Sequence, residues 1–375
     1  MKFIQKGIIN LLLRKKEVLN SKNKSTEKFQ PEKIKRVLLI SCTAIGDTIF
    51  AVPAIRAIKN LLPNGEVFDL LIRDKVFPLF KEFPLVDNYL LYKGHYRNAL
   101  QLLKLIKAKQ YDICISFHDS DPCPIEVSYL AGIKFIYRIA LKDQSTAKYL
   151  TSRIPYDENK HYIHQRLDIL RYLFDVPLNS KEDLRIDLPI KRDKIGQVWS
   201  DISKDCDIDL NNKRLIGFNF SASSLFKEWP LENFIELGNK ILTTNKDAVL
   251  VILGSPKDSK RAKKIISNIK FPYRTVDLAG KTTLANLPYV IAGLDCLVTN
   301  DTGPLHIAIS VQTKTVSLFV PSLPKNSGPI QDLMLHKVIS KPRPCNPCVG
   351  KYCKNPNCME LIKVDEVYEA INSLI

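Results

Sequence analysis

The sequence predicts two doubly wound α/β domains in tandem, and three observations lead to that fold class. First, its 375 residues are enough for two domains of about 150–200 residues each. Second, β-branched apolar runs alternate with amphipathic runs, which is typical of parallel sheets covered on both faces. Third, the alternation stops in a polar middle, roughly residues 150–213, and then begins again. We therefore expect ligands at the carboxyl ends of the strands, in a cleft between the domains.

The first domain begins with the apolar run RVLLIS (36–41), which predicts a buried strand, and a helix over 49–62 follows. VFDLLIR and YDICISF (111–117) predict further strands, with the helical spacing of RNALQLLKLIKAKQ between them. In the polar middle, HYIHQRLDILRYLF predicts a long helix. We place this domain at residues 36–195.

The second domain repeats the pattern. RLIGFNF predicts a strand that leads through a loop to a helix over 231–243. AVLVILG (248–254) predicts a second strand, ahead of a basic helix over 258–269. DCLVTN precedes a helix over 304–311, and TVSLFV closes the series. We place this domain at residues 196–375.

The positive charge is concentrated at the amino end. The net charge is +17, and residues 1–36 contain 11 Lys or Arg against 3 Glu. We treat residues 1–35 as a basic amphipathic leader, because Ile4, Ile8 and Leu11 lie near helical spacing. Such a helix can lie on an anionic membrane surface. A frayed basic tail is the alternative. We see no aromatic–basic motif for nucleic acid and expect no such partner.

No apolar run approaches the roughly 18–20 residues that span a bilayer, and no cleavage site follows GIINLLL, so we expect a cytoplasmic protein. Four of the nine cysteines crowd into CNPCVGKYCKNPNC. The Cys-x2-Cys opening is half of a zinc-site pattern, but the x4 spacings after it do not match common zinc sites. A metal site, a redox-linked pair and reduced thiols therefore all stay open for Cys345, Cys348, Cys353 and Cys358.

Two loops after strands of different domains carry groups that suit chemistry. In the first, Gly46 permits a tight backbone, and Asp47 stands where a helix begins, as a helix cap or as a functional carboxylate. The second loop, NFSASSLFKEWP (219–230), has three serines and Lys227 just before a helix. Hydroxyls and an ammonium suit a phosphate, although an ordinary serine-rich turn has the same composition.

A third loop, TNDTGPLHIA, lies where a strand leads into a helix. Asp301 ends the strand, and Thr302 and Gly303 make the turn. The proline that follows suits the first helical position. Unpaired N–H groups and the positive end of the helix dipole make such a turn an anion site. His306 lies one turn into the helix, either near the mouth of that site or as a structural histidine.

Together these loops resemble glycosyltransferase family 9, the bacterial heptosyltransferases of lipopolysaccharide core assembly, over about residues 36–370. The cysteine-containing tail resembles the heptosyltransferase II branch. The resemblance implies the GT-B fold, with two Rossmann-like domains and the sugar nucleotide held mainly by the second. It also implies inverting catalysis without a metal or other cofactor. It rests on the segments AIGDTIFAVPAIRAIKNLLP, KEWPLENFIELG, VILGSPKD, DLAGKTTLANLPYVIAGLDCLVTNDTGPLHIAIS and SLFVPSLPKNSGP.

By position, the resemblance also implies residue roles. Asp47 matches the family's proposed catalytic base, which takes the acceptor proton as the diphosphate leaves from the other face. Lys227 matches the lysine that contacts the diphosphate. The remaining positions are implied to bind substrate: Gly46, Ser223, Ser224, Gly254, Asp301, Thr302, Gly303 and His306.

The function implied is heptose transfer from ADP-heptose to a lipopolysaccharide core acceptor, by a cytoplasmic enzyme on the inner face of the inner membrane. One alternative is a family member that moves another nucleotide-activated sugar onto a surface polysaccharide. Another is a non-catalytic nucleotide- or membrane-binding protein on the same scaffold. A Rossmann dehydrogenase is disfavoured, because Gly-x-Gly-x-x-Gly does not follow the first strand.

Overall fold

The chain divides into two compact units, Met1–Arg185 and Ile186–Ile375. The sequence places the boundary at residue 195, further along the chain. The structure places it earlier because the N–H of Ile186 donates to Oε1 of Gln331 at 2.7 Å, deep in the second unit. The computed structural model describes residues 2–20, 29–118, 121–139, 145–345, 348–353 and 357–375.

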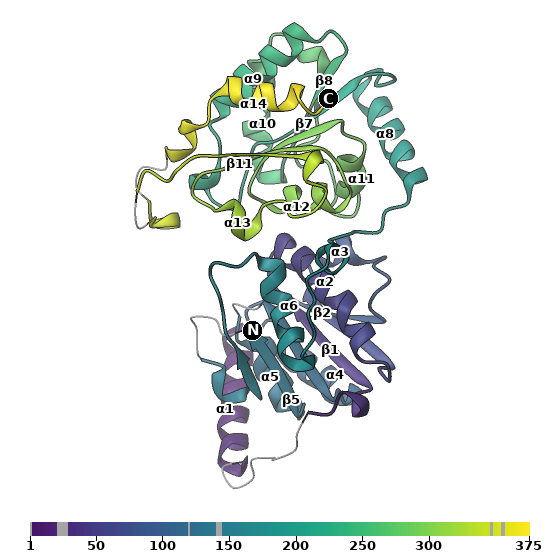
Figure 1. Cartoon of the computed structure of the whole chain (residues 1–375), viewed down its shortest axis with the longest axis vertical. Helices are drawn as coiled ribbons and strands as arrows, with labels where there is room; N and C mark the ends of the chain where they lie inside the picture. The colour runs from purple at the N-terminus through teal and green to yellow at the C-terminus, as the bar shows by residue number, and fades with distance from the viewer. Residues whose placement is uncertain (1, 21–28, 119–120, 140–144, 346–347, 354–356) are drawn as a thin grey trace. The chain divides into compact units, whose positions relative to one another are not determined.

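The described part of the first unit contains a six-stranded parallel sheet in the order β3-β2-β1-β4-β5-β6 (Figure 1). This is the strand order of a Rossmann-like domain, and it reverses between β1 and β4. Ligands of such sheets bind at the carboxyl ends of the strands beside that reversal. The strands are β1 (Arg36–Ser41), β2 (Val67–Arg73), β3 (Asn88–Tyr92), β4 (Ile113–His118), β5 (Phe135–Ile139) and β6 (Ser152–Ile154).

Helices cover both faces of this sheet, as the continuous apolar runs predict. α2 (Ile45–Leu61) packs against α6 (Tyr162–Phe174) on one face. α4 (Ala99–Lys109) packs against α5 (Cys123–Ala131) on the other. Short helices α3 (Phe77–Phe80) and α7 (Lys181–Leu184) complete the unit.

The basic leader belongs to the first unit. Most of it forms α1 (Lys2–Asn20), which contacts α4 and α5 and lies beside α5 in Figure 1. Ile9 and Leu13 are buried in the hydrophobic core of the unit. The expected helix is confirmed, and the alternative of a frayed tail is wrong, because one face of the helix is covered.

The apolar face that the sequence predicts for this helix is the exposed face of α1. Ile4 is 67 % exposed, Ile8 38 % and Leu11 54 %. Apolar side chains therefore lie on two faces of α1, one in the core and one in solvent. Among the described helices, none is both long enough and apolar enough to cross a bilayer.

The second unit repeats the architecture with its own six-stranded parallel sheet among the described residues, in the order β12-β11-β10-β7-β8-β9. The order reverses between β7 and β10, so the carboxyl ends of these two strands meet at the expected ligand position. The strands are β7 (Arg214–Asn219), β8 (Ala248–Leu253), β9 (Thr275–Asp277), β10 (Cys296–Asn300), β11 (Thr315–Phe319) and β12 (His336–Ser340).

Three helices of the second unit lie close to the ranges predicted for them, 231–243, 258–269 and 304–311. α9 (Leu231–Thr244) contacts α10 (Ser259–Ser267) and α14 (Val364–Asn372), and Figure 1 shows the three together. α11 (Leu287–Ala292) contacts α8 (Arg192–Cys206) and α12 (Gly303–Ser310). Strand residues such as Leu250 and Val298 are fully buried in a core that they form with the group of α9, α10 and α14.

We predict that His336 makes the stability of the fold pH-dependent. Its Nδ1 lies 2.9 Å from the buried hydroxyl of Thr315, and burial lowers the pKa of His336 from 6.5 to about 4. Between these values the unfolded chain binds the proton and the folded chain does not, so stability falls as pH falls. His336→Gln lacks this titration. The stability gap between wild type and variant, measured by urea unfolding, should narrow by about 1–3 kcal/mol from pH 7 to pH 4. A constant gap would contradict the prediction.

Candidate active site

Lys227 and Asp301 form an ion pair at the carboxyl edge of the second sheet. Nζ of Lys227 lies 2.8 Å from Oδ2 of Asp301. Lys227 follows β7 and Asp301 follows β10, and these strands are hydrogen-bonded neighbours. The sequence predicts both residues as site residues from different loops, and the parallel sheet brings them together.

Trp229 fixes the loop that carries Lys227. Its side chain is fully buried, and its indole N–H donates to the carbonyl of Ile362 at 3.0 Å. Its backbone N–H donates to Oδ1 of Asn300 at 3.0 Å, one residue before Asp301. The loop is therefore tied directly to the strand that ends at Asp301, which limits the positions that the lysine can take.

Asp301 is held ionised by its neighbours. Burial by itself raises its pKa, but the charges of Lys227 and His306 and hydrogen bonds from Lys227 and Ser322 outweigh burial and lower it. Nε2 of His306 lies 3.9 Å from Oδ1 of Asp301, and the hydroxyl of Ser327 donates to the same oxygen at 3.1 Å. The predicted His306 is thus part of one network with the ion pair.

The turn at Thr302 and Gly303 opens α12. Thr302 is the N-cap residue with an extended backbone, and its side chain makes no capping hydrogen bond. Both residues are partly exposed, whereas Leu305 and His306 are buried. The positive end of the helix therefore faces out beside the ion pair, which suits an anion.

The serine loop presents two hydroxyls near Lys227. Ser223 is exposed and Ser224 is partly exposed, and their hydroxyls have no hydrogen-bond partner among the residues described. The loop is braced from behind, because Oε1 of Glu228 accepts the N–H of Ala222 at 2.9 Å. Arg261 pairs in turn with Glu228. The sequence does not predict Glu228 and Arg261 as bracing residues, since nothing in the local pattern links them.

Gly254 has a packing role in this structure. A Cβ there would lie 3.0 Å from Cβ of Asp258 and 3.4 Å from Cβ of Ala279. The side chain of Asp258 accepts hydrogen bonds from the N–H and hydroxyl of Ser255 and from the hydroxyl of Ser221. Gly254 thus lets this turn lie close to the serine loop.

Asp47 lies in the first unit, in the first turn of α2. The N-cap residue of that helix is Ala44, so the alternative of a capping Asp47 is not what the structure contains. Oδ1 of Asp47 lies 2.9 Å from Nη2 of Arg166 on α6, and Arg166 is almost fully buried. Burial lowers the pKa of Arg166, while the carboxylate of Asp47 opposes that shift. Gly46 is buried beneath this turn.

A cavity of about 730 Å³ lies beside Asp47, within the size range of small-ligand sites. It sits at the carboxyl edge of the first sheet, because Cys42 and Thr43 after β1 and Arg73 at the end of β2 line it. Its charged lining is mostly basic and includes residues of α1. These charged residues are Lys2, Lys6, Asp47, Arg73, Lys75 and Asp121.

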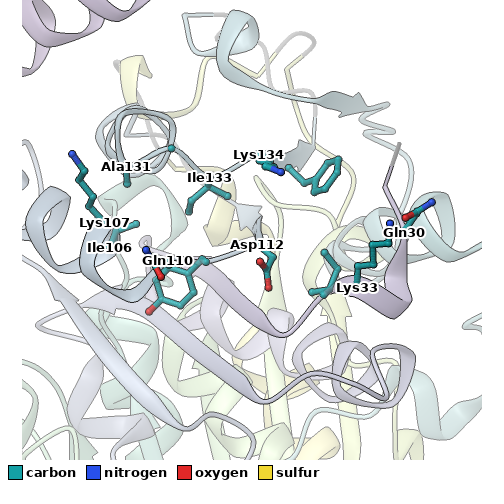
Figure 2. A pocket seen from close by; sticks show the side chains of 13 residues that line it. Gln30, Lys33, Ile106, Lys107, Gln110, Asp112, Ala131, Ile133 and Lys134 are labelled. Carbon is teal, nitrogen blue, oxygen red and sulfur yellow. The ribbon is translucent and has the colours of Figure 1, made fainter. Parts of the chain in front are cut away.

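Another cavity of the first unit, of about 380 Å³, lies at the amino ends of β4 and β5, away from the predicted residues (Figure 2). Lys107 and Lys134 stand at its rim, with Asp112 in its floor. Oδ2 of Asp112 accepts the backbone N–H groups of Lys35 and Arg36 at 2.9 and 2.8 Å. This carboxylate braces the start of β1.

The four cysteines of the C-terminal loop are free thiols in the structure. Within the described residues, no group of three His, Cys, Asp or Glu side chains is arranged to hold a metal ion. Residues 346–347 and 354–356 of this loop lie outside the described part of the chain.

Two Rossmann-like units in tandem give the GT-B fold, and solved structures share it. A family 9 glycosyltransferase from Veillonella parvula matches with a TM-score of 0.75 at 18 % identity, over 92 % of this chain and 98 % of that one. An ADP-heptose lipopolysaccharide heptosyltransferase II from Escherichia coli matches with a TM-score of 0.73 at 21 % identity, over 90 % and 98 %.

The chain belongs to glycosyltransferase family 9, the heptosyltransferase family, whose model matches residues 99–359. A lipooligosaccharide heptosyltransferase 2 from Campylobacter jejuni is 27 % identical over 346 residues, which is 88 % of this chain and 96 % of that protein. The resemblance drawn from the motifs is confirmed, and the chain is a glycosyltransferase.

We predict that Lys227→Met destabilises the second unit. It leaves the buried carboxylate of Asp301 without its cation, which should cost about 1–3 kcal/mol, less than a fully buried pair because Lys227 is partly exposed. Because the pKa of Asp301 in the folded protein lies below its ordinary value of 3.8, the ionised carboxylate stabilises the fold at pH values above 3.8. This stabilisation is lost as the pH falls through the pKa of the folded protein. The difference from wild type should therefore be largest near neutral pH and shrink below pH 3.8.

The double variant Lys227→Met/Asp301→Asn is the matched control. It removes both charges and should regain most of the stability, because no buried charge is left unpaired. Thermal unfolding of wild type, single and double variants measures the coupling. If the double variant is less stable than the single variant, the ion pair does not account for the loss.

Proposed function

We propose that this enzyme transfers heptose from ADP-heptose to an inner-core sugar of lipopolysaccharide, with inversion and without a metal. The observation that carries the proposal is the Lys227–Asp301 ion pair beside the exposed start of α12 and the serine hydroxyls. A cation, hydroxyl donors and a helix N-terminus together suit a diphosphate. Two similar proteins support the choice of substrates: one is a lipooligosaccharide heptosyltransferase, the other an ADP-heptose lipopolysaccharide heptosyltransferase.

In this mechanism Asp47 is the general base. Its carboxylate removes the proton of the acceptor hydroxyl, the hydroxyl oxygen bonds to the anomeric carbon, and the bond from that carbon to the diphosphate breaks. ADP leaves with the bonding electron pair. Asp47 must be ionised to accept the proton, and the guanidinium of Arg166 at 2.9 Å favours the ionised form.

The second unit stabilises the leaving group. Negative charge grows on the diphosphate as the glycosidic bond breaks, and the ammonium of Lys227 is already positioned by Asp301 and the Trp229 anchor. Groups that need no rearrangement during the reaction are the most effective at stabilising such charge. We infer that Lys227 supplies the positive charge that a metal ion supplies in other nucleotide-sugar enzymes.

The test is transfer from ADP-heptose to a deacylated core acceptor, followed by mass spectrometry of the product. We expect wild type to form the product equally well in the presence of EDTA. Asp47→Asn keeps an acceptor for the hydrogen bond from Arg166, so the fold should survive while turnover drops by roughly two to four orders of magnitude. Transfer from a different nucleotide sugar only, strict dependence on a divalent ion, or near-normal turnover of the variant would each refute part of the proposal.

Comparison with Lys227→Met separates the two roles in the same assay. Asp47→Asn should leave the affinity for ADP unchanged in calorimetry, because the base does not touch the nucleotide. Lys227→Met should weaken ADP binding and lower turnover, because its charge meets the diphosphate before and during bond breaking. If both variants changed ADP affinity and turnover in the same way, the two residues would not have separate roles.

We also propose that the enzyme attaches to the anionic inner leaflet through the exposed face of α1. Ile4, Ile8 and Leu11 form an apolar stripe on that face, and Arg14 and Lys15 on the same helix are exposed. Shallow insertion of such a stripe, with about 1 kcal/mol for each nearby basic residue, gives reversible binding. The attachment should weaken with salt, as the Debye length falls from about 10 Å at 0.1 M to 3 Å at 1 M.

The variant Ile4→Gln/Ile8→Gln/Leu11→Gln tests this attachment without touching the buried face of α1. We expect it to sediment several-fold less with anionic liposomes than wild type. Turnover on the soluble acceptor should stay unchanged. Leu333→Gln/Met334→Gln is the matched control, since both residues are exposed apolar side chains of the second unit. Equal sedimentation of wild type and the α1 variant would rule out this surface.

A further inference from the structure

The first two turns of α1 form one wall of the cavity beside Asp47. Lys2, Phe3 and Lys6 line it from that helix, together with residues at or after the ends of β1 and β2. Nζ of Lys6 lies 5.6 Å from the centre of the Tyr96 ring, and Tyr96 also lines the cavity. The leader therefore reaches the candidate acceptor side of the enzyme.

This wall is held in place by hydrogen bonds along the helix. The side-chain amide of Gln5 donates to the carbonyl of Arg97 at 2.8 Å, and its oxygen accepts the N–H of Leu100 at 3.2 Å. Further along, Nζ of Lys16 donates to the carbonyl of Tyr129 at 2.5 Å. With Ile9 and Leu13 in the core, these contacts give the basic residues of α1 defined positions at the cavity.

The charge in the cavity is unbalanced. The carboxylate of Asp47 is paired with Arg166, and Oδ2 of Asp121 accepts hydrogen bonds from the Tyr92 hydroxyl at 2.6 Å and the His95 N–H at 2.8 Å. The cations lack such partners. Among described residues, no carboxylate forms an ion pair with the four basic side chains of the lining, which are Lys2, Lys6, Arg73 and Lys75.

We propose that the first two turns of α1 are part of the acceptor-binding site, and that Lys2 and Lys6 bind acidic groups of the acceptor saccharide. The inference rests on the proposed role of Asp47 as the base that meets the acceptor. Cations that form no ion pair with a carboxylate attract oxyanions such as carboxylates and phosphates, with which they make strong charge-assisted hydrogen bonds. Arg73 and Lys75 supply two further cations of the same site.

Phe3 adds an apolar contact to this wall. Its ring is 81 % exposed although it lines the cavity, and Nζ of Lys2 lies 5.7 Å from its centre. Sugar-binding pockets combine a few polar groups with aromatic surface, against which the ring of a sugar can stack. The proposal thus assigns α1 two functions on different faces, lipid contact and recognition of the acceptor.

The experiment compares Lys2→Gln/Lys6→Gln with wild type in the full chain, on a soluble deacylated core acceptor. Without a lipid surface, membrane attachment does not contribute to the result. We expect the KM for the acceptor to rise by about ten- to hundredfold, while kcat and the KM for the donor change less than twofold. The salt dependence of the acceptor KM should become weaker, because two of the attracting charges are gone.

The matched control is Lys104→Gln/Lys107→Gln. Both lysines are exposed on α4 of the same unit, away from Asp47. Replacing them removes the same net charge as replacing Lys2 and Lys6. The control should behave as wild type, and since Lys107 lines the cavity of Figure 2, it also tests that cavity. Equal effects of the two variants, or an unchanged acceptor KM in Lys2→Gln/Lys6→Gln, would overturn the proposal.

Calorimetry with the deacylated core oligosaccharide keeps this test separate from the proposed function. If wild type binds the oligosaccharide but forms no product from ADP-heptose, the proposed reaction is wrong. A tenfold or greater loss of affinity in Lys2→Gln/Lys6→Gln still supports the α1 site in that case. If wild type does not bind the oligosaccharide at all, the α1 site is refuted. Thermal unfolding of both variants should match wild type, which excludes a loss of fold as the cause.

Discussion

The arrangement of the second unit depends on one partly buried ion pair, between Lys227 and Asp301. A carboxylate as buried as Asp301 is costly unless a cation and hydrogen bonds accompany it. The fold meets this requirement by bringing the ends of two neighbouring parallel strands together, and by anchoring the lysine loop through Trp229. The exposed start of α12 and the serine hydroxyls then lie around a positive charge that is already in position.

The first unit contains a similar ion pair in which the charges of the buried and the partly exposed partner are exchanged. There the partly exposed residue is the carboxylate of Asp47, and the buried partner is the guanidinium of Arg166 from α6. In both units the group nearer to solvent follows a strand at the reversal of strand order, and its counter-charge comes from a different element. Such pairs reduce the freedom of the outer group before any substrate arrives, which is what electrostatic catalysis requires.

The strands and the loop residues could be predicted from the sequence because their signals are local. Buried parallel strands appear as continuous apolar runs, and the motifs around Asp301 and Lys227 are short. Arg166 could not be found in this way, since HYIHQRLDILRYLF looks like an ordinary amphipathic helix and only packing against α2 reveals the partner. The packing of the leader helix α1 was even harder to predict. Its apolar residues at helical spacing indicate one face, whereas the face that enters the core carries Ile9 and Leu13. The sequence of the helix alone does not tell which of its two apolar faces is buried. That depends on how the rest of the unit packs against it.

The packing of α1 has a consequence for the order in which the chain is made. α1 is synthesised before the helices that contact it, α4 (Ala99–Lys109) and α5 (Cys123–Ala131), so Ile9 and Leu13 are made before the core that buries them. During synthesis of the intervening residues, both apolar faces of the nascent helix are uncovered. A basic helix with two apolar faces binds a bilayer surface more strongly than one with a single exposed face, since more apolar area enters the interface. Once α5 is complete, one apolar face of α1 is covered and the other stays exposed. The apolar area that α1 exposes therefore depends on how much of the chain has been made, and in the proposed membrane attachment it would be largest before the first unit has a core.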